Sequence, residues 1–283
     1  MGPSRIGPTL AEITRTADEA GFEWVGVMDH LFQIRSIGPP EREMLEAYTT
    51  LGFMAANSQR AKLVTLVTAV HHRQAGLLAK MVTTLDVLSG GRAWLGIGAG
   101  WNEQESRGLG IPFPPLKERF EELEETLQIC LRMWSDDESA FSGKHYRLER
   151  PLNSPQAIQR PHPPIMIGGS GERKTLRLVA RHADACNLWP TPQIPHKLKV
   201  LREHCEREGR DYHSILKTVV FTFDVGERGE KVDQVLGQLR WLAGMGIEAV
   251  IGNVKNVSMI DPLKIMGERV IPAAAEIEVK AAV

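Results

Sequence analysis

Apolar residues along this chain alternate between two patterns, one with the period of a helix and one with the short β-branched runs of buried strands. Leu10, Ile13 and Ala17 recur at spacings of three and four residues, as they do on one face of a helix. Gly21 ends this pattern, and residues 24–28 follow as a predicted strand. This order of helix and strand is typical of parallel βα units.

The same alternation continues to residue 251. Further strands are predicted at residues 63–67, 93–97, 165–167, 183–187, 219–224 and 249–251. One helix between them has an apolar face of Leu78, Met81, Val82 and Leu85 and a stop at Ser89, Gly90 and Gly91. Other helices are predicted at Phe120–Trp134, Glu172–Arg181 and Glu230–Met245.

The fold class that follows is α/β, a (β/α)8 TIM barrel that lacks its first β-strand. The pattern yields about seven strands and eight helices, and a closed barrel pairs the two in equal number. The absent strand would precede Thr9. We expect residues 1–283 to form a single domain. Residues 135–164 are rich in proline and polar side chains, and they are predicted to form an insertion over the barrel mouth, with a small hairpin at residues 141–148.

Composition and charge narrow the class of partner. Apolar residues make up 42% of the chain and charged residues 24%, which is ordinary for a globular protein. The 34 Lys and Arg residues are balanced by 35 Asp and Glu residues, and no basic stripe is present that would neutralise a row of phosphates. We therefore expect a small-molecule substrate and no nucleic acid partner.

Cysteines and apolar runs bear on the compartment. Cys130, Cys186 and Cys205 are widely spaced in a predicted helix, strand and helix, a pattern that fits neither a disulfide framework nor a zinc site. No signal-like apolar segment begins the chain, and no run reaches the ~18 apolar residues of a membrane-spanning helix. The expected location is the cytoplasm, with no membrane partner and no metal.

The residues that follow each strand are the candidates for chemistry, because barrel active sites lie at the carboxyl ends of the strands. Asp29 and His30 follow the strand at residues 24–28. A carboxylate beside an imidazole can position a ring and transfer protons near neutral pH. The alternative is a histidine with a structural role only.

Two further strand ends carry polar side chains. His71, His72 and Arg73 could meet an anionic ligand, although we prefer to interpret this segment as a solvated loop. After residues 93–97, glycines at 98 and 100 would let the backbone approach a flat ring closely. Trp101 and Asn102 would add a wall and an amide.

The strand at residues 165–167 is followed by the turn Gly168–Gly171, which is predicted to open a helix at Glu172. Free N–H groups and the positive end of a helix dipole are the ordinary means of holding a phosphate. The chain contains neither a Walker lysine motif nor a Rossmann dinucleotide motif.

Five stretches resemble the bacterial luciferase-like monooxygenase superfamily, in particular its actinobacterial group of coenzyme F420-dependent oxidoreductases. The resemblance covers nearly the whole chain, and residues 85–105 are its most specific part. The matching stretches are residues 20–32, 63–73, 84–92, 96–105 and 164–171.

The resemblance implies a role for each strand end. The Leu66–Val67 bond would be a non-proline cis peptide that props a bent flavin-like ring, and His30 would be the catalytic acid or base. The implied cofactor-binding residues are Asp29, Leu66, Val67, Thr68, Gly98, Ala99, Asn102, Gly168, Gly169 and Ser170. Apart from the resemblance, we expect His71, Trp101 and Trp189, with His72 and Asn253 as further candidates, to border the substrate pocket; the alternative for each is a core or loop residue. The family also implies a homodimer.

Two departures from the family pattern qualify these expectations. Sugar-phosphate dehydrogenases of the family have an acidic residue immediately after the glycine that corresponds to Gly98, whereas this chain has Ala99. A sugar-phosphate substrate is therefore not expected. The absent first strand normally contributes to the cofactor pocket, so weak or no cofactor binding is the second expectation.

The hypothesis is an oxidoreductase that transfers a hydride between the C5 carbon of coenzyme F420 and an unidentified small organic substrate, with His30 relaying a proton. One alternative is an FMN-dependent monooxygenase, in which reduced FMN reacts with oxygen. Another is a non-catalytic flavin-binding protein.

Overall fold

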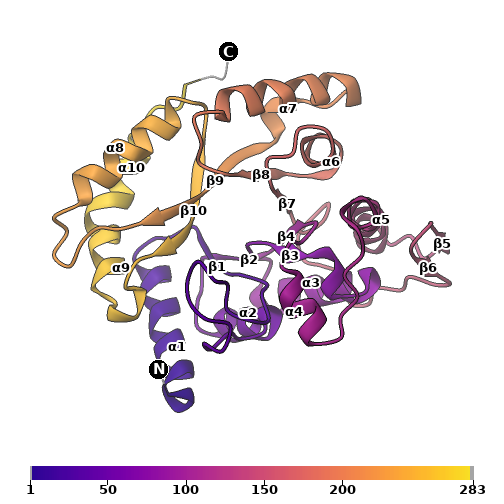
Figure 1. The fold of residues 1–283 in the computed structure, drawn as a ribbon, viewed down its shortest axis with the longest axis horizontal. Coiled ribbons are helices and arrows are strands. Elements are labelled where there is room, and N and C mark those ends of the chain that lie inside the picture. The colour runs from indigo at the N-terminus through magenta and orange to yellow at the C-terminus, as the bar shows by residue number, and fades with distance from the viewer. Residues whose placement is uncertain (1, 281–283) are drawn as a thin grey trace. The chain divides into compact units, whose positions relative to one another are not determined.

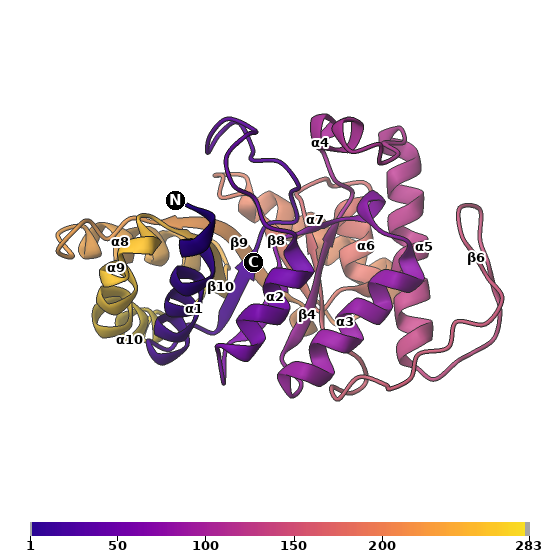
Figure 2. The same ribbon diagram turned by 90° about the horizontal axis from the view of Figure 1, so that it is seen from below.

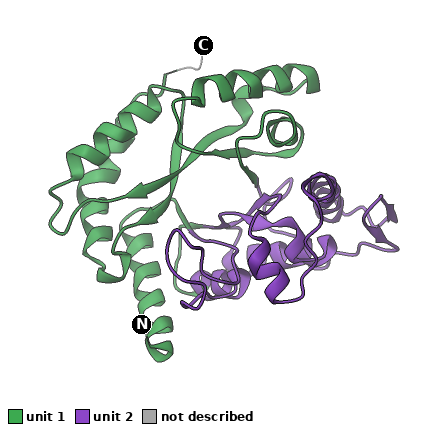
Figure 3. Ribbon diagram, viewed as in Figure 1, with its two compact units in different colours: residues 1–25, 56–62, 166–283 green, residues 26–55, 63–165 purple. Residues whose placement is uncertain are grey.

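Helix α1 (Pro3–Glu19) is the first element of the computed structural model, which describes residues 2–280. The chain forms two compact units that interleave along the sequence (Figure 3). Unit 1 consists of residues 1–25, 56–62 and 166–283, and unit 2 consists of residues 26–55 and 63–165.

Unit 2 is built on parallel strands whose carboxyl ends share one edge. Strand β1 (Trp24–Val27) neighbours β2 (Lys62–Thr65), and β2 and β3 (Thr68–Ala69) both pair with β4 (Ala93–Gly98) in parallel. The strand predicted at residues 63–67 is therefore interrupted after Thr65 and resumes at Thr68. Leu66 N–H continues the contact by donating to the Val27 carbonyl at 2.8 Å.

Glycine at two strand positions permits this close packing. A Cβ atom added to Gly96 would lie 1.8 Å from the Thr65 carbonyl oxygen, and one added to Gly26 would lie 2.7 Å from the Val64 carbonyl oxygen. Any larger residue at these positions would force the backbones apart.

Helices α2 (Ala47–Ala56), α3 (Ala75–Ser89), α4 (Glu103–Gly108) and α5 (Leu116–Trp134) complete unit 2. Helix α3 packs against α5, and the indole of Trp134 donates to the Thr83 hydroxyl at 3.0 Å. The predicted buried face of α3 is confirmed at Leu78, Val82 and Leu85, whereas Met81 is half-buried. Gly90 ends the helix in the left-handed conformation, with a φ of 71°.

The segment 135–164 contains the predicted hairpin, formed by β5 (Phe141–Ser142) and β6 (Arg147–Leu148) in antiparallel pairing. The prediction that residues 135–164 lie over the barrel mouth is wrong. The backbone N–H groups of Ile158 and Gln159 donate to Asp86 near the end of α3, and the Gln159 side chain donates to the Ala93 carbonyl.

The physical reason is topological. Helix α5 begins near α4, beside the carboxyl ends of the strands, and runs toward the opposite end of the strands (Figure 2). The segment that follows α5 therefore starts at that opposite end, where it must enter the amino end of the next strand. A connection from a helix to a parallel strand therefore lies opposite the active-site face.

Unit 1 contains the parallel strands β7 (Ile165–Gly168), β8 (Ala185–Leu188), β9 (Leu216–Phe223) and β10 (Ala249–Val254). Helices α6 (Thr175–His182), α7 (Ile194–Glu208) and α8 (Val232–Ala243) connect them, and α6 packs against α7 (Figure 1). Helices α9 (Asp261–Ile265) and α10 (Ile271–Ala275) follow, and α1 packs against α9.

The three cysteines lie in the elements predicted for them. Cys130 is in α5, Cys186 is in β8 and Cys205 is in α7, and all three are buried and free. Within residues 2–280, no helix is both long and apolar enough to cross a membrane.

Candidate active site

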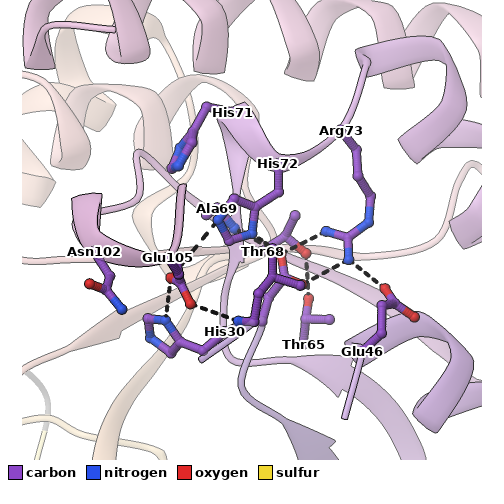
Figure 4. A network of polar contacts seen from close by, with 12 residues as sticks. His30, Glu46, Thr65, Thr68, Ala69, His71, His72, Arg73, Asn102 and Glu105 are labelled. Carbon is purple, nitrogen blue, oxygen red and sulfur yellow. Dashed lines mark hydrogen bonds and ion pairs between the residues drawn. The ribbon is translucent and has the colours of Figure 1, made fainter. Parts of the chain in front are cut away.

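The carboxyl ends of β1 and β4 bring together His30 and Glu105, which are 75 residues apart in the sequence (Figure 4). The His30 Nδ1 atom lies 2.7 Å from Glu105 Oε1. The other carboxylate oxygen accepts the backbone N–H groups of Leu31 at 2.7 Å and Phe32 at 3.1 Å. The side chain of Glu105 is 1% exposed and that of His30 is 14% exposed, so a buried carboxylate holds an accessible imidazole.

The charge of Glu105 follows from these contacts. Burial alone would raise the pKa of the carboxyl, but the hydrogen bonds with His30 and with the two backbone N–H groups hold it below its ordinary value. Glu105 is therefore a carboxylate at neutral pH.

Asp29 is buried within unit 2, and its hydrogen bonds with the described residues are to groups other than His30. Arg73 donates to both of its carboxylate oxygens, at 2.7 and 2.9 Å, and Ala69 N–H donates at 3.2 Å. Arg73 also donates to Glu46 at 2.5 Å. Burial would raise the pKa of Asp29, but the nearby His72 and Arg73 lower it to about 2. Asp29 therefore anchors the strand end, and the resemblance-based expectation that it faces a ring gains no support from these contacts.

The preferred interpretation of His71 to Arg73 as a solvated loop is wrong. This segment turns back as the short 3-10 helix Val70–His72, which packs against α5. The His72 side chain is 2% exposed, with Nδ1 3.4 Å from Asp29 Oδ2 and Nε2 3.9 Å from Glu105 Oε1. The paired charges of Asp29, Arg73 and Glu46 make burial of this polar segment tolerable.

His71 faces a different set of neighbours. Its Nε2 atom lies 2.9 Å from the Ser106 hydroxyl, and its ring meets Phe113 edge-on with centroids 5.0 Å apart. Burial, and then the nearby side chains of His72 and Arg119, lower the pKa of His71 to about 4. His71 is therefore neutral at physiological pH.

The strand end at residues 66–68 has the predicted backbone feature. The peptide bond between Leu66 and Val67 is cis, and both side chains are half-buried. Thr68 is fully buried, and its hydroxyl lies 2.8 Å from those of both Thr65 and Tyr48. Thr68 thus supports the strand end from inside, which differs from the expected cofactor contact.

The turn after β4 places an aromatic ring beside His30. Trp101 is 63% exposed, and its ring lies edge-on to His30 with centroids 5.3 Å apart. Arg119 donates to the Ala99 carbonyl at 3.0 Å, and a Cβ atom on Gly100 would lie 2.5 Å from the His71 ring. Asn102 is half-buried and directly precedes α4. The structure therefore brings His30, which follows β1, together with Trp101, which lies in the turn between β4 and α4.

The predicted residues of unit 1 form a group of their own. Gly168 ends β7 opposite Asn187, and the Ser170 hydroxyl accepts the backbone N–H of Trp189 at 3.1 Å. Trp189 is 61% exposed. Helix α6 begins at Thr175, so the predicted start at Glu172 is wrong by a turn. No Ser, Thr, Asp or Asn side chain caps this helix, so the sequence lacks the signal that marks a start.

Sequence reasoning assigned no role to Glu105, Arg119 or Tyr48. Glu105 lies in the stretch that resembles the family most specifically, and this was the one signal that could have identified it. Its partnership with His30 depends on tertiary structure. Among residues 2–280, no group of three or more His, Cys, Asp or Glu side chains could hold a metal ion.

The fold is a mostly parallel α/β barrel with a histidine–carboxylate pair at its strand ends, and comparisons with known proteins assign it to a class of oxidoreductases. Residues 7–264 match the luciferase-like monooxygenase family, and the chain belongs to this family. An uncharacterized protein of Mycobacterium tuberculosis is 32% identical over 219 residues, which cover 72% of this chain and 76% of that protein.

Two relatives have named activities. The F420-dependent glucose-6-phosphate dehydrogenase of Nakamurella multipartita is 33% identical over 214 residues, covering 73% of this chain and 60% of that enzyme. The FMNH2-dependent dimethylsulfone monooxygenase of Pseudomonas putida is 30% identical over 174 residues, covering 61% and 46% of the two chains.

A solved structure confirms the fold class. The coenzyme F420-dependent tetrahydromethanopterin reductase of Methanopyrus kandleri superimposes with a TM-score of 0.78 at 16% identity, covering 94% of this chain and 95% of that one. The predicted luciferase-like α/β barrel is therefore correct.

Proposed function

We propose that this protein transfers a hydride between coenzyme F420 and a small organic substrate, with His30 moving the accompanying proton. One observation carries the proposal. The Nδ1 atom of His30 is bound to Glu105, whereas the hydrogen bonds of the described residues include none to its Nε2 atom, and the side chain keeps 14% of its surface exposed. An imidazole anchored on one side and available on the other is the arrangement that proton transfer requires.

The residues around His30 fit a flat ring. Leu66 and Val67 present half-buried apolar side chains, and Ala99, the residue directly after β4, is also half-buried, whereas Gly98 is buried as the last residue of β4. The Asn102 side chain makes no hydrogen bond within residues 2–280, so its amide is available to a ring carbonyl. When bound, a deazaflavin supplies the carbon that accepts or donates the hydride.

The contribution of the chain is positioning and proton transfer. Trp101 limits the space beside His30, and Arg119 holds the turn that carries Trp101. Holding two reactants in register removes much of the entropic barrier, in the best cases on the order of 10 kcal/mol.

Support for F420 comes from the dehydrogenase relative, and support for FMN comes from the monooxygenase relative. We favour F420 because the F420-dependent relative matches a larger share of this chain. The family resemblance implies that sugar-phosphate dehydrogenases carry an acidic residue where this chain has Ala99, so we propose a substrate other than a sugar phosphate.

The test is equilibrium binding of F420 and of FMN, followed by turnover of the wild type and of His30→Ala. We expect F420 to bind more tightly. His30→Ala should bind F420 normally and lose roughly 10²- to 10⁴-fold in turnover, the usual contribution of general acid–base catalysis. His213→Ala is the matched control, because His213 is an exposed histidine of unit 1.

Three results would count against the proposal. Tighter binding of FMN with rapid oxygen consumption would favour a monooxygenase. Unaltered turnover by His30→Ala would remove His30 from the reaction. A melting temperature that neither cofactor shifts would favour a protein that binds no flavin.

A further inference from the structure

The contacts of Glu105 determine which nitrogen of His30 carries the proton. One carboxylate oxygen already accepts two backbone N–H groups, from Leu31 and Phe32. The other oxygen lies 2.7 Å from His30 Nδ1. A carboxylate has no proton to donate, so Nδ1 must be the donor in this hydrogen bond. In the neutral ring the second nitrogen, Nε2, is then bare.

The surroundings keep the carboxylate in this orientation. Glu105 is 1% exposed and lies in the first turn of α4, with both oxygens held on the β1 side. The other group near its Oε1 atom is His72, whose Nε2 is 3.9 Å away and whose Nδ1 faces Asp29 at 3.4 Å. Asp29 is held in turn by Arg73, which also contacts Glu46. These contacts limit rotation of the carboxylate.

We propose that Glu105 is a positioning residue that fixes His30 as the Nδ1–H tautomer, so that the resting enzyme presents a proton acceptor to the substrate. This inference rests on the proposed function and narrows its substrate class to compounds with a hydroxyl-bearing carbon. The C–H bond of that carbon breaks, and both electrons leave with the hydride to oxidised F420. The hydroxyl proton passes to His30 Nε2 as the C=O bond forms. The imidazolium that results is paired with the Glu105 carboxylate.

Glu105→Gln tests the proposal because glutamine has nearly the same shape. Its carbonyl oxygen can still accept the Leu31 and Phe32 N–H groups, but its NH2 group then faces His30 Nδ1 and can only donate. The proton of neutral His30 should therefore move to Nε2. The readout is the 15N NMR spectrum of His30 in cofactor-free protein, in which the protonated and bare nitrogens should exchange places between wild type and variant.

Kinetics provide the second readout, with propan-2-ol and oxidised F420 as the probe reactants. We expect Glu105→Gln to keep F420 affinity within about threefold and to lose roughly 10²- to 10⁴-fold in kcat. Glu105→Asp keeps a carboxylate and should recover part of the rate. Glu103→Gln is the control, because Glu103 lies on the same helix and its ion pair is with exposed Arg107.

The outcomes separate this inference from the proposed function. A wild-type His30 protonated on Nε2, or a Glu105→Gln variant still protonated on Nδ1, overturns the tautomer assignment whatever the activity. A second outcome is that the spectra show the expected tautomers but neither the wild type nor any variant oxidises propan-2-ol. This outcome would support the tautomer assignment and overturn the proposed substrate class. If Glu105→Gln does not fold, the tautomer assignment is tested by the 15N spectrum of wild-type His30 and by the rate that Glu105→Asp recovers.

Discussion

Two neighbouring residues, Asp29 and His30, belong to different parts of the site. Their adjacency suggests one acid–base pair, but the structure directs Asp29 to Arg73 and His30 to Glu105. Asp29 is 2% exposed, and its two carboxylate oxygens accept hydrogen bonds from the two terminal guanidinium nitrogens of Arg73. A buried bidentate pair is costly to break, because the remaining charge has no water to solvate it.

Arg73→Met should therefore destabilise the protein by roughly 3–5 kcal/mol at pH 7, measured by urea unfolding. The double variant Asp29→Asn/Arg73→Met should recover part of this loss, because it removes the unpaired carboxylate as well. Arg107→Met is the matched control, since Arg107 is exposed and should change stability by no more than about 0.5 kcal/mol. Equal losses in the Arg73 and Arg107 variants would show that the buried pair contributes nothing.

At the scale of elements, the site depends on how closely β2 and β4 approach. All six residues of β4 are buried, and Gly96 lies against the Thr65 carbonyl at a distance that no Cβ atom could share. The Thr65 hydroxyl also donates to the Gly96 carbonyl at 2.8 Å. A change at Gly96 would thus displace the strand that leads into the Gly98 turn and the one that leads into Leu66.

Gly96→Ala should lower the unfolding midpoint sharply or prevent folding, because the atom it meets is backbone and cannot move aside. Gly52→Ala provides the comparison. Gly52 lies in α2 with open space around it, so alanine there should stabilise by up to about 1 kcal/mol through helix propensity. Thermal unfolding of both variants measures the difference, and a Gly96→Ala protein as stable as wild type would contradict the packing argument.

At the scale of the whole molecule, buried acids anchor both units. In unit 1, Asp18 accepts the backbone N–H groups of Gln59, Arg60 and Ala61. Although burial opposes the shift, these bonds lower the pKa of Asp18, as similar contacts lower those of Asp29 and Glu105 in unit 2. Because the native pKa values are below the unfolded ones, these groups stabilise the fold above their unfolded pKa values and lose that contribution as the pH falls. For Asp29, whose native pKa is about 2, the loss extends from about pH 4 toward pH 2.

His71 should make stability decline before the carboxylates do. Its pKa is about 4 in the native state against 6.5 in its ordinary state, so the unfolded chain binds this proton first. The melting temperature should therefore begin to fall below about pH 6.5 and fall further below pH 4. His71→Asn should flatten the part between pH 6.5 and 4, whereas His213→Asn should leave it unchanged. Superimposable curves for wild type and His71→Asn would refute this role for His71.

Sequence patterns alone predicted the order of helices and strands, the barrel class and the hairpin at residues 141–148. Each of these depends on local periodicity or turn chemistry, which neighbouring residues carry. The packing of strands and helices decided the rest. It paired His30 with Glu105 across 75 residues, buried His72 and placed residues 135–164 beside the end of α3. Such contacts depend on strand register and helix direction, and no short stretch of sequence contains that information.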